Sequence, residues 1–186
     1  MSQCTEEIII AGFGGQGVSL AGKVLAQAAM HTGREVTYMP SYGAEVRGGT
    51  SNCMVIVADE PIASPVISSP QTCVVMNKAS FDKFAPRVRT GGLLIVNSSR
   101  VTDDCSRQDI EVVPVAADEI ATAMGSPRSA NMVMLGAYLA KRGLVTLDDA
   151  AEALPEVLAE RHHKTLPLNI EAIRKGAELI ALYATQ

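Results

Sequence analysis

The sequence lacks several features that mark common classes of protein. It has no tryptophan, and aromatic residues make up only 4% of its 186 residues, so the composition suits closely packed layers rather than stacking platforms. It has no basic block that could neutralise a row of phosphates, and 16 basic against 20 acidic residues give a net charge of −4. We therefore expect no nucleic-acid partner. The longest apolar runs fall far short of the roughly 18 residues needed to cross a bilayer, so no membrane contact is expected either.

Closely spaced cysteine pairs are also missing. The four cysteines contain no Cys-x-x-Cys pair: Cys4, Cys53, Cys73 and Cys105. Neither a zinc ribbon nor a cubane iron–sulfur cluster has ligands at usable spacing, so we interpret the cysteines as reduced thiols. The first residues carry acidic charge where a secretory signal would carry basic charge, which favours a cytoplasmic protein.

The composition is that of a globular protein, with 47% hydrophobic and 19% charged residues. Its length and the absence of a linker predict a single domain over residues 1–186. Strands are predicted at residues 6–11, 35–39, 50–58, 73–76, 93–96 and 111–115, with a short edge strand at 65–67. Helices are predicted from Val18 to Gly33 and at residues 80–84, 118–124, 130–141, 147–160 and 167–183. This alternation favours an α/β fold, a mainly parallel sheet with helices on both faces in a Rossmann-like three-layer sandwich.

Residues 12–17 read Gly-Phe-Gly-Gly-Gln-Gly, which fits G-x-G-x-x-G directly after a predicted strand and at the start of a predicted helix. In this context free backbone N–H groups and the helix dipole can hold a phosphate. The alternative is a tight turn that only allows close packing. Gln16 adds an amide that could either bind a ligand or brace the neighbouring loop. The candidate contacts in this motif are Gly12, Gly14, Gly15, Gln16 and Gly17.

A nicotinamide-binding fold would also place an acidic residue at the end of the second strand, where it holds the ribose hydroxyls. That position reads Met-Pro-Ser at residues 39–41, and the nearby acid, Glu35, comes at the beginning of the strand. We therefore expect Glu35 to point away from the ligand edge, which weakens the dinucleotide interpretation.

Residues 40–49 hold three glycines and a proline and are predicted to form a surface loop. Loops after successive strands meet at the carboxyl edge of an α/β sheet, so this loop is expected beside the glycine turn. Arg47 carries a planar guanidinium group that can bind a carboxylate or phosphate, and Glu45 could neutralise that group in the free subunit. A solvated loop with an incidental ion pair is the alternative. The candidate contacts here are Ser41, Tyr42, Glu45 and Arg47.

A few other polar residues fall at informative positions. Asn77 follows a predicted strand at the edge where ligands gather, and it could also cap the next helix. Asn131 is expected to belong to a helix cap or to contact a partner. His162 and His163, interpreted as surface residues, project about 100° apart on a predicted helix and so cannot share one metal ion. We assign no catalytic and no metal-ligating residue.

Taken together, these motifs resemble the γ subunit, or the corresponding domain, of the 2-oxoacid:ferredoxin oxidoreductases. The likeness is carried by residues 12–18, by Ser-Tyr-Gly-Ala-Glu-Val-Arg-Gly-Gly at residues 41–49 and by Ile-Ala-Ser-Pro at residues 62–65. Further landmarks are Asn77 and residues 91–97, 131–136 and 168–172. One departure is Ala44, where many relatives have proline.

The resemblance implies an oxidative decarboxylation in which a 2-oxoacid, coenzyme A and oxidised ferredoxin give an acyl-CoA, carbon dioxide and reduced ferredoxin. It also implies partner subunits, α, β and as a further candidate δ, that carry thiamine diphosphate, magnesium and iron–sulfur clusters. The chain itself has no Gly-Asp-Gly followed by Asn at the spacing of a thiamine diphosphate site. It is therefore expected to bind none of these cofactors, to be inactive alone, and to complete a hetero-oligomer.

Coenzyme A is the remaining phosphate-bearing reactant, and the resemblance makes the glycine turn and Arg47 candidates for its nucleotide end. In the other interpretation, both loops pack against the thiamine-binding subunit and only shape its active site. Residues 42–49 and 64–65 favour the 2-oxoglutarate or general 2-oxoacid branch over the pyruvate branch. Two other classes stay open, a free-standing NAD(P)-binding Rossmann oxidoreductase and a non-enzymatic assembly module.

Overall fold

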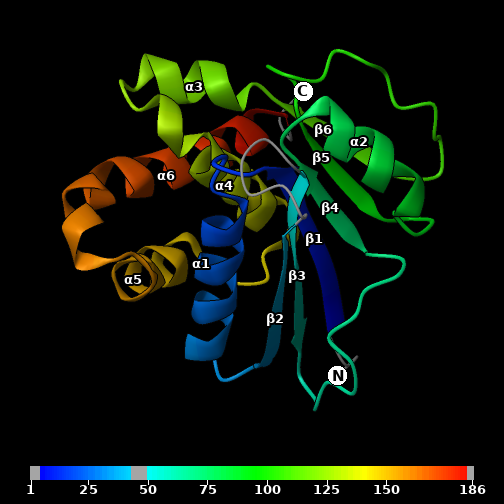
Figure 1. Ribbon diagram of the computed structural model, residues 1–186, viewed down its shortest axis with the longest axis horizontal. Coiled ribbons are helices and arrows are strands. Elements are labelled where there is room, and N and C mark those ends of the chain that lie inside the picture. Colours follow the sequence, from blue (N-terminus) through cyan, green and yellow to red (C-terminus); the bar gives the residue numbers. More distant parts are fainter. Residues whose placement is uncertain (1–4, 43–49, 184–186) are drawn as a thin grey trace.

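The computed structural model describes residues 5–42 and 50–183, which form a six-stranded sheet with helices on both faces (Figure 1). The strands are β1 (Thr5–Phe13), β2 (Glu35–Tyr42), β3 (Thr50–Ala58), β4 (Thr72–Val75), β5 (Leu93–Asn97) and β6 (Glu111–Val115). The helices are α1 (Val18–His31), α2 (Lys78–Phe84), α3 (Ala117–Ala123), α4 (Ala130–Arg142), α5 (Leu147–Val157) and α6 (Leu166–Tyr183). Three 3₁₀ helices connect them: η1 (Ala85–Arg87), η2 (Pro127–Ser129) and η3 (Glu160–Thr165).

The sheet order is β2-β3-β1-β4-β5-β6. Strands β1, β4, β5 and β6 are parallel, whereas β3 runs antiparallel between β2 and β1. The predicted α/β fold with a mainly parallel sheet is therefore confirmed, and β3 is its one antiparallel member in the described ranges. Because β3 reverses direction, β2 ends at the same sheet edge as β1, β4, β5 and β6.

Two apolar clusters hold the layers together, one on each face of the sheet. Along β1 the side chains alternate between them: Ile8 and Ile10 join the cluster under α1, α4, α5 and α6, while Ile9 joins the cluster under α2. This is the period-two pattern of a strand buried on both faces. All three isoleucines are buried, and each contributes about 1.5–3 kcal/mol of hydrophobic stabilisation. The first cluster is the larger, so most helices cover one face.

Two sequence predictions about strands are wrong. Residues 65–67 form no strand, and Ile67 instead fills the cluster beneath α2. The flanking prolines remove ladder donors, so burial of Ile67 determines the path of this segment. Residues 40–42 were predicted as loop but continue β2, where Pro40 is tolerated because β2 is an edge strand. The rest of that predicted loop, residues 43–49, lies outside the described residues.

The helical C-terminal part is confirmed with one correction. The helix predicted over residues 147–160 ends at Val157, after which Leu158 is extended and η3 begins. Pro155 lies within the last turn, where its missing N–H weakens the helix. At the other end Thr146 caps α5 in a capping box with Asp149. In the described part of the chain, no helix combines the length and apolarity that a bilayer span requires.

Candidate functional site

The glycine motif forms the predicted strand-turn-helix. Strand β1 ends at Phe13, the N–H of Gln16 donates to the carbonyl of Phe13 at 3.1 Å, and α1 begins at Val18. Gly15 and Gly17 have φ angles of 97° and 74°, a region that favours glycine. Gly17 is the N-cap of α1, and no side chain caps the helix. The first turn of α1 also carries no acidic residue.

Close packing explains two of the glycines. A Cβ on Gly12 would lie 2.8 Å from Val18 Cγ2 and 3.0 Å from Met76 Cβ. A Cβ on Gly17 would lie 2.4 Å from Nδ2 of Asn131, which donates to the Gly17 carbonyl at 3.0 Å. Asn131 therefore joins α4 to the turn, and its side chain does not cap α4. At these two positions the packing interpretation is supported directly.

The same turn also contains backbone N–H groups that donate to no acceptor. Within the described ranges, the N–H groups of Gly14, Gly15 and Gly17 have no acceptor. Gly14 and Gly15 are exposed, and a Cβ on Gly15 would meet nothing within 4 Å. A helix N-terminus with free N–H groups and open space is suited to an anion. The turn thus combines a packed side at Gly12 and Gly17 with an open side at Gly15.

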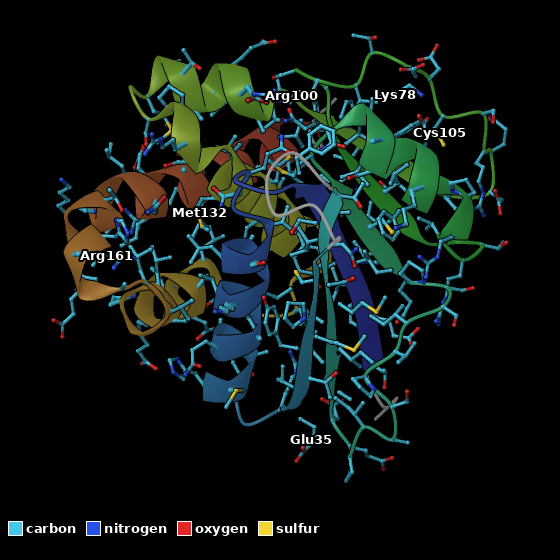
Figure 2. All side chains as sticks on the ribbon, viewed as in Figure 1. Glu35, Lys78, Arg100, Cys105, Met132 and Arg161 are labelled. Atoms are coloured by element: carbon cyan, nitrogen blue, oxygen red, sulfur yellow. The ribbon has the colours of Figure 1, made fainter. Side chains whose placement is uncertain are left out.

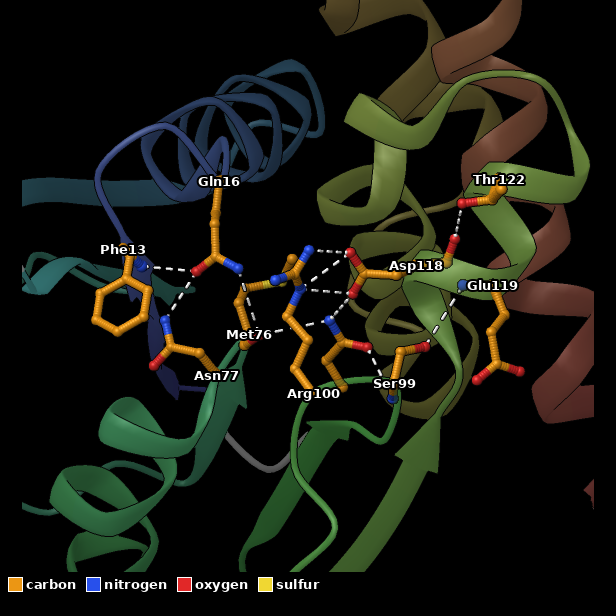
Figure 3. A network of polar contacts seen from close by, with 10 residues as sticks. Phe13, Gln16, Met76, Asn77, Ser99, Arg100, Asp118, Glu119 and Thr122 are labelled. Atoms are coloured by element: carbon orange, nitrogen blue, oxygen red, sulfur yellow. Dashed lines mark hydrogen bonds and ion pairs between the residues drawn. The ribbon is translucent and has the colours of Figure 1, made fainter. Parts of the chain in front are cut away.

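Gln16 braces the neighbouring strand end, which is one of its two predicted roles. Its Oε1 accepts from the N–H of Phe13 at 2.7 Å and from Nδ2 of Asn77 at 2.8 Å (Figure 3). Its Nε2 donates to the carbonyl of Met76 at 3.5 Å. Both the oxygen and the nitrogen of the Gln16 amide therefore have hydrogen-bond partners within the protein.

Asn77 lies at its predicted position and fulfils one of its two predicted roles, that of a helix cap, while its contact with a ligand stays a prediction. It follows β4 at the carboxyl edge, and its Oδ1 accepts from the N–H of Ser80 at 2.9 Å, which caps α2. The side chain is buried, so the cap and the bond to Gln16 together fix its orientation.

The polar network continues along the sheet edge through residues that sequence reasoning missed. Nδ2 of Asn97 donates to the Met76 carbonyl at 3.4 Å and to Oδ2 of Asp118 at 2.6 Å (Figure 3). Arg100 binds both oxygens of Asp118, at distances of 2.7 to 3.0 Å. Asn97 directly follows a predicted strand, the same signal that marked Asn77, and could have been found by it.

Arg100 and Asn97 stabilise the charged form of the Asp118 carboxylate. Burial acts to raise the pKa of the Asp118 carboxyl, but hydrogen bonds from Arg100 and Asn97 outweigh it and keep the pKa below its ordinary value of 3.8. Arg100 is half exposed at this edge. Its guanidinium is therefore already paired, and it is not a free cation for a ligand.

The strand residues on either side of the second candidate loop lie at the same sheet edge as the glycine turn. Tyr42 pairs with Ser51, and Ser51 pairs with Gly12 on its other side. Ser41 is exposed and pairs with Asn52. Glu45 and Arg47 lie outside the described residues, so their approach to the turn stays a prediction.

The position beside β1 does not suit a nicotinamide dinucleotide. The strand next to β1 on the side of β2 is the antiparallel β3. A dinucleotide-binding fold has a parallel strand at this position, and that strand ends in an aspartate or glutamate. Glu35 pairs with Ala58, which pairs with Thr5 at the start of β1. Figure 2 shows Glu35 at the opposite end of the molecule from Lys78 and Arg100. The prediction that Glu35 lies away from the glycine turn is confirmed.

The described side chains do not fit an iron–sulfur cluster or a magnesium site. Cys53 and Cys73 belong to the apolar clusters on opposite faces of the sheet, where burial raises the pKa of both thiols to about 12. Over residues 5–42 and 50–183, no group of three His, Cys, Asp or Glu side chains is placed to hold a metal ion. His162 and His163 lie in η3, where His162 is exposed and His163 is half-exposed, with its Nε2 at hydrogen-bond distance from the carbonyl oxygens of Pro155 and Leu158.

The fold and its glycine turn define a Rossmann-like α/β protein with its candidate ligand edge at the carboxyl ends of the strands. A family model for pyruvate ferredoxin/flavodoxin oxidoreductase matches residues 7–179. The chain belongs to this family of oxidoreductases.

Curated relatives are of two lengths. Ketoisovalerate oxidoreductase subunit VorA of Methanothermobacter thermautotrophicus is 41% identical over 171 residues, which covers 91% of this chain and 35% of the relative. The chain thus spans about a third of the length of the VorA relatives it matches. 2-Oxoglutarate synthase subunit KorC of Methanocaldococcus jannaschii is 33% identical over 177 residues, covering 94% of this chain and 93% of the relative.

Solved structures share the fold. The γ subunit of a keto/oxoacid ferredoxin oxidoreductase from Geobacter sulfurreducens matches with a TM-score of 0.82 at 29% identity, covering 94% of this chain and 95% of that one. A 2-oxoglutarate:ferredoxin oxidoreductase from Magnetococcus marinus has a TM-score of 0.87 at 23% identity, and the match covers 96% of this chain and 31% of that one. At that identity the second match supports the fold alone.

Proposed function

We propose that this chain is the γ-type subunit of a cytoplasmic 2-oxoacid:ferredoxin oxidoreductase. The complex would convert a 2-oxoacid and coenzyme A into an acyl-CoA and carbon dioxide, with two electrons passing to ferredoxin. The observation that carries this proposal is the family match over residues 7–179, together with KorC relatives of nearly the same length. The proposed substrate is 2-oxoglutarate.

In this proposal the chain supplies structure and hydrogen-bond donors, and its partners supply the cofactors. Thiamine diphosphate, magnesium and iron–sulfur clusters would reside on α, β and, where present, δ subunits. Support comes from Cys53 and Cys73, which are buried on opposite faces of the sheet and so cannot ligate one cluster together. The chain alone is expected to be inactive.

We further propose that the glycine turn contacts coenzyme A. The free N–H groups of Gly14, Gly15 and Gly17 would face a phosphate, and Arg47 would add charge from the adjacent loop. Glu45 would neutralise Arg47 in the free subunit, and Ser41, Tyr42 and Asn77 would border the site. Gln16 would act through its bridge to Asn77.

Co-purification tests the complex. The tagged chain, isolated from its own cells, should bring down partner polypeptides that contain thiamine diphosphate and iron–sulfur clusters. The assembly should reduce ferredoxin with coenzyme A and one of three acids, 2-oxoglutarate, ketoisovalerate or pyruvate, whereas the separated chain should not. Partners without these cofactors would support a non-enzymatic assembly module instead. Binding of NAD by the isolated chain would favour the free-standing dehydrogenase.

A single substitution tests the proposed coenzyme A contact. In the assembled complex, Arg47→Ala should weaken coenzyme A affinity about tenfold, because one charge-assisted contact is lost. Arg174→Ala, at an exposed position on α6, is the matched control and should leave the affinity unchanged. Unchanged affinity for Arg47→Ala in an intact assembly would remove the direct contact and leave the loops with a shaping role.

A further inference from the structure

Helices cover the two faces of the sheet unequally. Helices α1, α4, α5 and α6 lie over one face, whereas the other carries α2, a helix of seven residues that packs mainly against β1 and β4. Figure 1 shows α2 on the side of β4 and β5, away from β2. Over β3 this second face is bordered by residues 59–71, which form no helix or strand. Sheets of this type normally carry helices on both faces, so the part formed by β2 and β3 is unusually open.

Two methionines and a threonine occupy this open part of the sheet. Met39 of β2 pairs with Met54 of β3, which pairs with Ile9 of the cluster beneath α2, so the three side chains share one face. Met39 and Met54 are half-buried, and in the described ranges Met39 belongs to neither apolar cluster. Oγ1 of Thr37, on the same face, is buried without a hydrogen-bond partner among the described residues. Flexible methionine side chains are well suited to pack against a partner.

A hollow of about 340 Å³ continues the same face towards the amino end of β1. Ile56 of β3, which pairs with Thr37, lines it together with Ile62 and Val66. The side chain of Val66 is 58% exposed, which is high for a large apolar residue. Residues 62–64 of the Ile-Ala-Ser-Pro motif also line the hollow. The proposed contact with coenzyme A assigns no role to this motif, which lies at the other end of the strands from the glycine turn.

The segment that borders the hollow is fixed in place although it has no regular secondary structure. The guanidinium of Arg87 donates to the carbonyls of Ile67 at 2.9 Å and Ser68 at 3.2 Å. Arg89 donates twice to the carbonyl of Ser69, at 2.8 and 3.0 Å. Three prolines within residues 59–71 restrict the backbone further. A surface that is already ordered loses little conformational entropy when a partner binds.

The charge around the hollow is acidic. Glu7 and Glu60 line it, and none of the residues that line it is basic. Glu35 is exposed beside it, because Glu35 pairs with Ala58 of the hollow across β2 and β3. Glu7 forms an ion pair with Arg89, which neutralises one of the three carboxylates. Two copies of this face brought together would place like charges opposite each other, which is unfavourable. A partner with basic residues beside an apolar side chain fits the face better than a second copy does.

We propose that this face docks a partner subunit of the oxidoreductase. An apolar side chain of the partner would fill the hollow beside Val66, its lysine or arginine residues would pair with Glu35 and Glu60, and Met39 would pack against it. The inference rests on the proposed function for the existence of the partner, and it adds which surface of this chain the partner meets. In the VorA relatives a unit similar to this chain accounts for 35% of a longer polypeptide, so there it is joined to a larger body.

Methionine oxidation tests the inference on the unaltered chain. Hydrogen peroxide treatment followed by mass spectrometry should show Met39 and Met54 oxidised about fivefold more slowly in the complex than in the free chain. Met30 is the control, because it is 55% exposed on α1, over the other face of the sheet, and should react equally fast in both. Unchanged oxidation of Met39 and Met54 would overturn the inference. Protection of Met30 alone would place the interface on α1 and would also overturn it.

Substitution locates the contact on the face. In titrations of the purified chain into the partner subunits that co-purify with it, Val66→Arg should raise Kd more than about tenfold. Met30→Arg makes the same kind of change at a similarly exposed site on α1 and should leave Kd unchanged. Glu35→Gln, at an exposed position, covers the case in which Val66→Arg disturbs folding, and should raise Kd about threefold with a stronger effect at low salt. Thermal melting checks the fold of each variant.

The outcomes separate this inference from the proposed function. Equal Kd values for Val66→Arg, Glu35→Gln and the wild type would overturn the docking face and leave the complex standing. A dimer of the free chain that light scattering shows to be lost in Val66→Arg, with partner binding unchanged, would assign the face to a second copy and overturn the inference. If the wild-type chain bound no cofactor-bearing partner, the proposed complex would be wrong, and this docking with it.

Discussion

The side chain of Gln16 connects the end of β1 to the end of β4, because its Oε1 accepts hydrogen bonds from both the Phe13 N–H and Asn77 Nδ2. Helix α1 follows β1 onto one face of the sheet and α2 follows β4 onto the other, so the two strand ends flank a topological switch point. Ligands of open α/β sheets usually bind in the crevice at such a point. Here an amide of the turn itself spans the crevice. The open side is a groove of about 530 Å³, lined by Gly15 and Gly17 of the turn and by Arg128 of η2.

Gln16→Ala should lower the free energy of unfolding by about 1–3 kcal/mol, since the Phe13 N–H and Asn77 Nδ2 lose their common acceptor. Urea unfolding followed by circular dichroism measures this loss. Gln27→Ala is the matched control, because Gln27 bonds only to exposed partners, among them Glu156, and should change stability by less than about 0.5 kcal/mol. Equal losses for the two variants would show that the bridge adds no stability.

Local signals located most elements of the fold. Strands β3 and β6 begin and end where the sequence predicts them, and α1 ends just before Gly33, whose φ of 77° suits the end of a helix. The sheet order was not predictable in the same way. Nothing in the alternation of residues 50–58 shows that β3 runs antiparallel between β2 and β1. The spacing of hydrophobic residues shows which faces of a strand are buried, but not which strand lies next to it or in which direction that strand runs.

For the site, sequence reasoning found some of the residues but not their contacts. The glycine motif marked Gln16 and the end of a predicted strand marked Asn77, and only the fold brings their side chains within 2.8 Å. The bond from Asn131 to Gly17 joins positions 114 residues apart, and the groove beside it is built from segments that carry no recognisable motif. Such long-range relationships arise from tertiary packing, which local patterns do not encode.

The ion pair of Asp118 and Arg100 should make stability depend on pH. The pKa of the Asp118 carboxyl lies below its ordinary value of 3.8 in the folded protein. The stabilisation that the charged carboxylate gives to the folded protein is therefore complete above pH 3.8 and is lost as the pH falls towards the folded pKa. Asp118→Asn should therefore cost up to about 1 kcal/mol at pH 7, a value reduced by solvent screening at the half-exposed Arg100.

Urea midpoints of the wild type and Asp118→Asn, measured from pH 7 to pH 2.5, check this. The difference between them should shrink as the pH falls below about 4. A constant difference over the whole range would assign the effect to packing rather than to charge. Glu119→Gln, one residue further along α3 with an exposed side chain, is the control and should be nearly neutral.

The cysteines should differ sharply in reactivity. Burial raises the pKa of the Cys53 and Cys73 thiols to about 12, so both stay protonated and shielded near neutral pH, whereas Cys105 is half-exposed. In a Cys4→Ser chain, Ellman's reagent should titrate one thiol in the native protein at pH 8 and three after unfolding in guanidinium. Adding Cys105→Ser should abolish the native reaction. Rapid native labelling that persists in the double variant would contradict the burial of Cys53 and Cys73.

The contact between α4 and α6 should tolerate no added methyl group at its centre. A Cβ on Gly136 would lie 1.8 Å from the carbonyl oxygen of Ile173, so Gly136→Ala must push the helices apart. We expect a loss of about 3 kcal/mol, which for a chain of this length lowers Tm by roughly 6–12 °C in a calorimetric scan. Ala140→Val adds two carbons at an exposed position of the same helix and should cost less than about 1 kcal/mol. Similar small shifts for both variants would mean that α4 and α6 can separate without cost, and the groove that rests on their alignment would then lack a rigid wall.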